Sequence, residues 1–228
     1  MKGTLASVQV GQPQHYGTEG APAKLDQPWH TSFFRAPSAE PRWLFTTHLE
    51  GNEQADKRNH GTLDQAVLLY AAANYELWQA ELGRDDMGAG GFGENFTVTE
   101  LSEATVCIGD IYAIGDAVIE VTGPRYPCWK ISQRWGIADL TDRVAATGRT
   151  GWYAQVRHEG QIAPGAAITL VERPYADITI GAINACAHGH NRDRDQVRTL
   201  MASPALDDFW RNVIARQLRS ATATSPET

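Results

Sequence analysis

The chain has little cysteine and no long apolar run. Only three of its 228 residues are cysteine, and no two of them form a Cys-x-x-Cys pair. An odd, widely spaced set gives no disulfide framework and no recognised structural zinc site. No apolar stretch reaches membrane-spanning length, and residues 1–10 lack the charged-then-apolar layout of a secretion signal. These absences predict a cytoplasmic protein that has no membrane partner.

The chain also has fewer basic than acidic residues. The chain has 20 Lys and Arg residues against 27 Asp and Glu residues, a net charge of -7. This balance argues against non-specific binding of nucleic acid. The length is enough for one large or two small domains with a sizeable core. Residues 220–228 are polar, without an apolar pattern, and are predicted to form a disordered tail.

The stretch that carries the most chemistry is residues 122–131, which holds Cys128 between two prolines. Pro124 and Pro127 each fix φ and remove a backbone donor, so the segment is predicted to be a stiff, non-helical turn. Such a turn would present one side chain, the thiol of Cys128, in a fixed position. The alternative is a buried, inert cysteine, because free Cys is among the most buried residue types.

Three cations lie close to Cys128 in the sequence: Arg125, Lys130 and Arg134. If they converge in space, they favour a thiolate over a thiol. A thiolate is both a nucleophile and a soft metal ligand. The other two cysteines, Cys107 and Cys186, have apolar neighbours and are predicted to be packing residues.

Short apolar runs dominate the chain up to about residue 172 and are separated by Gly-Asp turns. Strands of this length and spacing predict a β-barrel or closed sandwich rather than a doubly wound sheet. The fold class is therefore mainly β over residues 1–173. The predicted strands include residues 5–10, 95–99, 106–108, 111–114, 117–121, 152–157 and 167–171.

Helical patterns occur in the middle and at the end of the chain. Apolar residues recur every three or four positions over residues 63–82, which predicts a helix with Thr62 as N-cap and Gly83 as its stop. After Arg173-Pro174 the composition shifts, and three helices are predicted to form a small unit over residues 174–219. They span residues 180–187, residues 195–202 and a third segment in which Ser203 is the N-cap and Pro204 the first helical residue.

Two loops are candidates for ligand contacts. Lys57, Arg58 and His60 precede the predicted helix, and basic groups at a helix N-terminus suggest an anion site; a solvated loop is the alternative. Residues 84–93 form a Gly-rich loop without the spacing of a Walker-type or dinucleotide-binding loop. We interpret it as a flexible loop against a ligand or as a plain surface loop. In the first case Glu94 and Asn95 at its exit would supply polar contacts.

Six motifs follow one another along the chain: LEGN at 49–52, QADKRNHG at 54–61, FGENFT at 92–97, VCIGD at 106–110, PRYPCWK at 124–130 and GRTGWY at 148–153. Their order and combination resemble the MOSC domain family, named after the C-terminal domain of molybdenum cofactor sulfurase. The resemblance covers nearly the whole chain and is strongest to the YiiM-type branch, which carries a three-helix C-terminal appendage.

This resemblance implies a β-barrel-like fold and a molybdenum cofactor (molybdopterin), with Cys128 as the molybdenum ligand. It also implies that Lys57, Arg58 and His60 line the cofactor pocket, where the three cations near Cys128 would serve the same anion. Proteins of this type reduce N-hydroxylated compounds such as hydroxylamino-purines, with electrons from a separate donor protein. Pyridoxal phosphate is attached to the family only as a label, and no Schiff-base lysine is evident here.

The chain departs from the family pattern at two positions. Many relatives have Gly-Asp where this chain has Gly-Asn52, and a second histidine where it has Asn59. These departures leave substrate choice and activity open. Two other functions therefore remain: Cys128 as a metal-free nucleophile or sulfur carrier, and a non-catalytic module that stores or delivers the cofactor.

Overall fold

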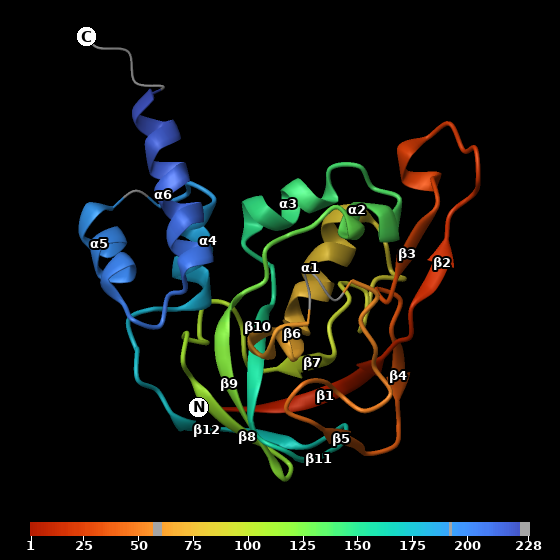
Figure 1. Ribbon diagram of the computed structural model, residues 1–228, viewed down its shortest axis with the longest axis horizontal. Helices are drawn as coiled ribbons and strands as arrows, with labels where there is room; N and C mark the ends of the chain where they lie inside the picture. Colours follow the sequence, from red (N-terminus) through yellow and green to blue (C-terminus); the bar gives the residue numbers. More distant parts are fainter. Residues whose placement is uncertain (57–60, 192, 224–228) are drawn as a thin grey trace.

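Seven strands close into a barrel in the computed structural model, which describes residues 1–56, 61–191 and 193–223 (Figure 1). The strands follow the order β12-β8-β9-β10-β6-β7-β1, and β1 pairs with β12 to close the ring. The β6–β7 pair is parallel and the other pairs are antiparallel. The mainly β, barrel-like fold predicted from the sequence is therefore confirmed.

The barrel strands are β1 (Lys2–Val10), β6 (Val67–Ala71), β7 (Phe96–Thr99), β8 (Ile111–Ile114), β9 (Ala117–Pro124), β10 (Trp152–His158) and β12 (Ala167–Glu172). Short strands flank the barrel: β4 (Ala36–Ser38) pairs with β1, β2 (Gln14–Tyr16) with β3 (Trp29–Thr31), and β5 (Arg42–Leu44) with β11 (Gly160–Ile162). The helices are α1 (Ala73–Leu82), α2 (Lys130–Trp135), α3 (Leu140–Thr147), α4 (Ile180–Ala187), α5 (Arg194–Ala202) and α6 (Asp208–Ala223), with 3-10 turns η1 (Lys24–Asp26) and η2 (Leu63–Gln65).

The barrel closes because its strands alternate apolar and polar residues. Along β9, Ala117, Ile119 and Val121 are buried, and the residue that follows each of them is half-buried. The inward residues of all seven strands form one core, which includes Leu5, Phe96, Ile119 and Trp152. A strand with one buried face has a fixed register, because a one-residue slip would turn its apolar side chains outward. The barrel is thus a rigid frame for the loops at its ends.

The predicted helix over residues 63–82 is wrong in its first half. Residues 67–71 form β6, which pairs with β10 on one side and with β7 on the other, and all five of its residues are buried. A short apolar run buried on both faces has no periodicity that separates a strand from a buried helix. Residues 63–65 form the 3-10 helix η2, with Thr62 at its N-cap position, and α1 begins only at Ala73; Gly83 ends α1 as predicted, with a φ of 62°. The α-helix that was predicted to follow Lys57, Arg58 and His60 directly is therefore absent from residues 63–72, and the anion site itself falls on residues outside the described ones.

Two other predicted elements differ from the structure. Residues 106–108 form no strand; Cys107 makes only an isolated bridge to Thr179. The last helix begins at Asp208 rather than at Ser203, and Asp207 caps it by accepting a hydrogen bond from the Trp210 amide at 2.8 Å. Both Ser203 and Asp207 are good N-cap residues, so composition alone does not choose between them. Helix α6 continues to Ala223, past the predicted start of the tail.

Helices α4 to α6 form a unit with its own core, and this unit packs against β9 at one side of the barrel (Figure 1). Trp210 of α6 lies against Gly123 of β9, where an added Cβ would be 3.1 Å from the indole Nε1. Asp110, fully buried beneath the junction, pairs with Arg173 at 2.6 Å. The helical unit is thereby attached to the strand that leads directly into the Cys128 segment. Across the described residues, no helix combines the length and apolarity needed to cross a bilayer.

Candidate functional site

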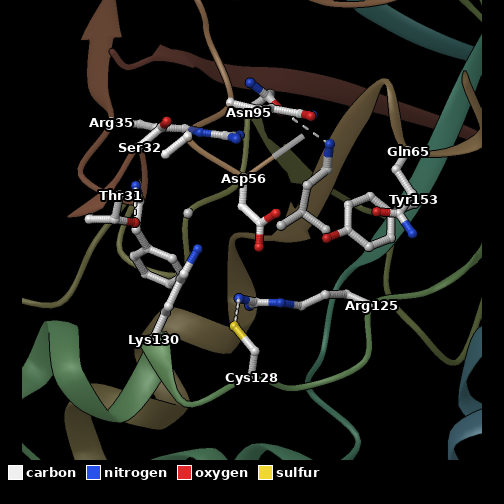
Figure 2. A pocket seen from close by; sticks show the side chains of 15 residues that line it. Thr31, Ser32, Arg35, Asp56, Gln65, Asn95, Arg125, Cys128, Lys130 and Tyr153 are labelled. Carbon is white, nitrogen blue, oxygen red and sulfur yellow. Dashed lines mark hydrogen bonds between the residues drawn. The ribbon is translucent and has the colours of Figure 1, made fainter. Parts of the chain in front are cut away.

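A cavity opens at one end of the barrel, with Cys128 in its wall (Figure 2). Its walls come from the segment before β4, the loop after β5, the starts of β6 and β7, the turn after β9, and β10. The described lining residues are Thr31, Ser32, Phe33, Arg35, Gln54, Ala55, Asp56, Gln65, Leu68, Gly93, Asn95, Arg125, Cys128, Lys130 and Tyr153.

The Cys128 segment is held in place by its backbone. The Arg125 amide donates to the Gly151 carbonyl at 3.1 Å, which extends the β9–β10 ladder by one residue. The Cys128 carbonyl accepts from the Ile131 amide at 3.1 Å and from the Thr141 hydroxyl at 3.1 Å. The thiol is half-buried and free of any disulfide. The non-helical turn therefore presents Cys128 at the cavity, and the thiol is not fully buried as the alternative required; its reactivity stays a prediction.

Arg125 supplies positive charge next to the sulfur. Its side chain is only 4% exposed, and its guanidinium Nη2 lies 3.7 Å from Cys128 Sγ. The other terminal nitrogen donates to the Phe92 carbonyl at 3.1 Å, and the guanidinium stacks over the Phe33 ring. A buried charge needs such partners, because desolvation otherwise disfavours it. Arg125 is thus locked in an orientation in which it donates to the thiol sulfur.

Arg35 is the second cation of the cavity and lies opposite Arg125 (Figure 2). Its Nε and Nη1 atoms are buried and have no hydrogen-bond partner among the described residues, and the same holds for the hydroxyl of Ser32. Burial lowers the pKa of Arg35 to about 10; Tyr153 and Glu94 oppose this effect and Arg125 reinforces it. Buried donors without partners are costly. They indicate a place for an anion that would accept from them.

Lys130, Asp56 and Tyr153 complete the cavity (Figure 2). Lys130, the first residue of α2, reaches in from beside Cys128, and the Asp56 carboxylate lies among the three cations. Burial raises the pKa of Tyr153, and the nearby Arg125 opposes this effect. The described lining residues therefore carry three positive groups against one carboxylate, which favours an anionic ligand.

The described residues contain no group of three or more His, Cys, Asp or Glu side chains placed to hold a metal ion. A metal at Cys128 would therefore have one protein sulfur ligand and would have to bring further ligands with it. A metal carried by an anionic organic cofactor meets that condition, and soft metals prefer a thiolate. The donor set of the cavity fits this type of group.

Comparison with known proteins decides the family. The model of the MOSC domain matches residues 56–169, which include Cys128, the whole of β6 to β10 and the first half of β12. The chain belongs to the MOSC domain family. It is 33% identical over 208 residues to the uncharacterized protein YflK of Bacillus subtilis, spanning 91% of each chain. It is also 34% identical over 175 residues to protein YiiM of Escherichia coli, spanning 74% of this chain and 76% of YiiM.

A solved structure supports the same assignment. The crystal structure of YiiM from Geobacillus stearothermophilus matches this MOSC chain with a TM-score of 0.74 and 30% identity, over 95% of this chain and 99% of that one. A protein of Gibberella moniliformis named reductase is 34% identical over 189 residues, which span 81% of this chain but 33% of that protein. The resemblance stated from the motifs is confirmed.

Glu94 and Asn95, predicted to contact a ligand, differ in position within this MOSC domain. Asn95 lines the cavity, but its amide Oδ1 accepts from the Leu68 amide at 3.2 Å and its Nδ2 donates to the Gln9 carbonyl at 3.4 Å. Glu94 is fully buried and is not among the described lining residues. The main task of both side chains is to hold neighbouring backbone in place.

Glu94 holds the backbone of the Gly-rich loop. Its carboxylate accepts from the Gly90 amide at 2.7 Å, the Phe92 amide at 3.2 Å, and the hydroxyls of Tyr75 at 2.5 Å and Thr97 at 2.8 Å. Burial raises the pKa of Tyr75 well above its usual value, and the adjacent Glu94 charge adds to the effect. The end of the loop lies in the cavity wall, where Gly93 lines it, and the predicted flexibility of the loop stays a prediction.

Arg134 does not join the other cations. It lies one helical turn beyond Lys130, and its guanidinium stacks over the rings of Phe34 and Trp135, at 4.1 and 4.9 Å from their centroids. Burial lowers its pKa.

Asn52, one of the two departures from the family pattern, also lies away from the cavity: it is buried, and its Oδ1 accepts from the Gly11 amide. Its loss of a carboxylate changes a loop contact rather than the cavity wall.

Lys57, Arg58, Asn59 and His60 lie outside the described residues, so their predicted role stays a prediction. Sequence reasoning missed Arg35, Asp56 and Tyr153. Asp56 and Tyr153 each stand inside a motif that carried the family resemblance, and this signal was available. Arg35 follows two phenylalanines in a stretch without a motif, and only the folded chain brings it to Cys128.

Proposed function

We propose that this protein binds a molybdenum cofactor through Cys128 and reduces N-hydroxylated compounds to the parent amines. The observation that supports this most is the pairing of one accessible sulfur with buried, cationic donors. Cys128 Sγ lies 3.7 Å from Arg125, and two buried nitrogen atoms of Arg35, Nε and Nη1, have no partner among the described residues. A thiol-ligated metal and an anionic organic group would use both features.

The residues divide the binding task. Cys128 would ligate molybdenum; Arg35 and Arg125 would donate to the negative groups of the pterin, and Lys130 would add charge at the entrance. When bound, the cofactor supplies two-electron oxygen-atom transfer chemistry. The protein's part is to orient the group, to surround its charge and to hold the protons that the reaction consumes.

The overall reaction fixes how many protons are needed. Reduction of a hydroxylamine, R–NHOH + 2 e⁻ + 2 H⁺ → R–NH₂ + H₂O, requires two protons near the nitrogen and the departing oxygen. The Tyr153 hydroxyl and the Lys130 ammonium both line the cavity wall that contains Cys128. Burial keeps the pKa of Tyr153 high, so its hydroxyl retains its proton. We assign these two groups as the proton donors.

The electrons would come from a separate donor protein. Three cysteines cannot supply the four thiolates of an ordinary iron–sulfur cluster, and the sequence carries no flavin motif. The reductase name of the Gibberella moniliformis relative agrees with a redox role, although this chain spans only a third of that protein.

Molybdenum content tests the proposal. Protein made in a host that synthesises the cofactor should contain close to one molybdenum per chain, and Cys128→Ser should contain none. Cys107→Ser is the matched control, because Cys107 is buried and its thiol only donates to the Ala176 carbonyl, a bond that serine can replace. Equal molybdenum in wild type and Cys128→Ser would refute the ligand assignment. Full molybdenum without reduction of any hydroxylamine, given a chemical electron donor, would instead favour the cofactor-binding module.

A further inference from the structure

A second chamber lies beside the first, between the barrel and the helical unit. Its described walls include the segment before β6, the end of β9 with the turn that follows, and the start of α6. The two chambers share part of their walls, so a ligand in one is next to a ligand in the other. The shared residues are Asp56, Gln65, Cys128, Lys130 and Tyr153.

Aromatic rings dominate the outer part of this second chamber. Tyr126, Trp129 and Phe209 line it and are 49%, 55% and 51% exposed. Tyr126 and Phe209 meet edge to face with ring centroids 5.6 Å apart, so the barrel and α6 touch through these rings. Half-exposed aromatic side chains gathered at one concave place are typical of a binding site rather than of an ordinary surface.

Among the described lining residues, the charge of the second chamber is opposite to that of the first. Asp56 and Lys130 line both chambers, whereas Asp64 and Asp207 line only the second and the cations Arg35 and Arg125 line only the first. The Asp207 carboxylate is fixed by the hydrogen bond from the Trp210 amide. An anionic group in the second chamber would be repelled by both carboxylates, and a neutral or cationic group would not.

The helical unit places its residues firmly. Trp210, adjacent to Phe209, is buried against Gly123, five residues before Cys128. A ring on α6 and a sulfur after β9 are therefore held in one fixed arrangement. The helical unit, whose role the family resemblance does not explain, thus contributes Asp207 and Phe209 to the wall of the site.

We propose that the second chamber binds the substrate, and that it selects flat aromatic amines and hydroxylamines that carry no phosphate or other anionic group. The rings of Trp129 and Phe209 would bind the flat substrate from the barrel and the helical unit, and Asp207 would reject anions. This inference rests on the proposed function, in which the first chamber holds the anionic cofactor and Cys128 lies at the boundary.

The binding of a reaction product tests the rings without any turnover. Adenosine serves as an aromatic amine and is titrated by calorimetry into cofactor-loaded and cofactor-free protein. Phe209→Ala and Trp129→Ala should each weaken its binding about fivefold to tenfold. Trp43→Ala is the matched control, because Trp43 is 41% exposed on β5 and does not line either chamber. Equal binding by all three variants and wild type would overturn the proposal.

The phosphate of adenosine 5′-monophosphate tests the charge. Adenosine 5′-monophosphate should bind to cofactor-loaded protein at least tenfold more weakly than adenosine does. Asp207→Asn should reduce this difference in affinity, and the asparagine should still cap α6. Asp208→Asn makes the same charge change on the next residue, outside the described chamber wall, and should have a smaller effect. Equal affinity for the two ligands, or equal effects of the two substitutions, would overturn the charge selection.

These results separate the two proposals. Phe209→Ala should keep its molybdenum, because Phe209 does not line the first chamber. If wild-type protein contains no molybdenum but binds adenosine through Phe209, the chamber is confirmed and the proposed function fails. If molybdenum is present and the affinity for adenosine is unchanged in Phe209→Ala and Trp129→Ala, the inference fails and the proposed function remains.

Discussion

The two chambers that meet at Cys128 are built in different ways. The first is part of the barrel: Arg125 is 4% exposed and bonded to the backbone, and Glu94 is fully buried beneath the floor. The second is made where two units touch, and its rings are about half exposed. A substitution in the first chamber should therefore change stability, upward or downward, together with binding, whereas one in the second should change ligand choice alone. This separates a fixed cofactor site from an adaptable substrate site.

The largest expected effect is that of Glu94→Ala on stability. It removes an acceptor from two amides and two hydroxyls and leaves these donors buried. Each unsatisfied donor is costly, so the free energy of unfolding should fall by about 3 kcal/mol or more. Urea denaturation measures it. Glu76→Ala, an exposed glutamate of α1, should change stability by less than about 0.5 kcal/mol, and a similar loss in both variants would contradict this account.

The next effect distinguishes the three cysteines by reactivity. An alkylating reagent should modify Cys128 at least tenfold faster than Cys107 or Cys186 in the folded protein. Burial raises the pKa of both of these thiols, and Asp110 raises that of Cys107 further. Mass spectrometry of tryptic peptides gives the three rates. Prior loading with cofactor should protect Cys128 from alkylation. Comparable alkylation rates at all three cysteines would contradict the position of Cys128 in the cavity wall.

Arg35→Met should have opposite effects on binding and on stability. In the absence of a ligand, the buried Nε and Nη1 atoms of Arg35 have no partner among the described residues. Methionine fills similar space without these donors, so the unfolding free energy should rise by about 1 kcal/mol. Cofactor retention should fall at least tenfold. Arg143→Met, an exposed position on α3, is the control. Lower stability in Arg35→Met would show that the guanidinium has a structural partner.

The barrel strands were predicted from the sequence more accurately than the residues that line the cavity. The strands over residues 111–114, 117–121 and 152–157 were found because alternation and Gly-Asp turns are local signals. β6 was missed because a strand buried on both faces has no alternation. Burial between β10 and β7 is a tertiary property, and no pattern within residues 67–71 reports it.

The same limit applies to the cavity. Cys128, Arg125 and Lys130 were predicted together and lie together, since they share one short segment. Arg134 belongs to that segment too, but one turn of α2 carries it about 6 Å along the helix axis from Lys130, and its guanidinium stacks on Phe34. Arg35 comes from a remote strand connection and is brought in only by the barrel closure. Proximity in sequence therefore predicts proximity in space within a turn, and fails after one turn of helix.

The smallest expected effect concerns the helical unit and pH. His188 ends α4, its Nε2 is buried without a partner among the described residues, and its ring lies 6.1 Å from Tyr126 of the second chamber. Burial lowers its pKa below 6.5, and nearby His190 lowers it further. Below pH 6.5 the unfolded chain binds a proton that the folded one resists, so stability is lost as the pH falls.

This contribution is best measured as a difference between variants. Burial raises the pKa of Asp207, so its carboxyl acts in the opposite direction and favours the folded state at low pH. Between pH 7.5 and 5.5, His188→Gln should therefore lose less unfolding free energy than wild type, by under about 1 kcal/mol because the group is partly exposed. His158→Gln, exposed at the end of β10, should follow wild type. If His188→Gln also follows wild type, protonation of His188 does not weaken the packing that holds Phe209 beside the barrel.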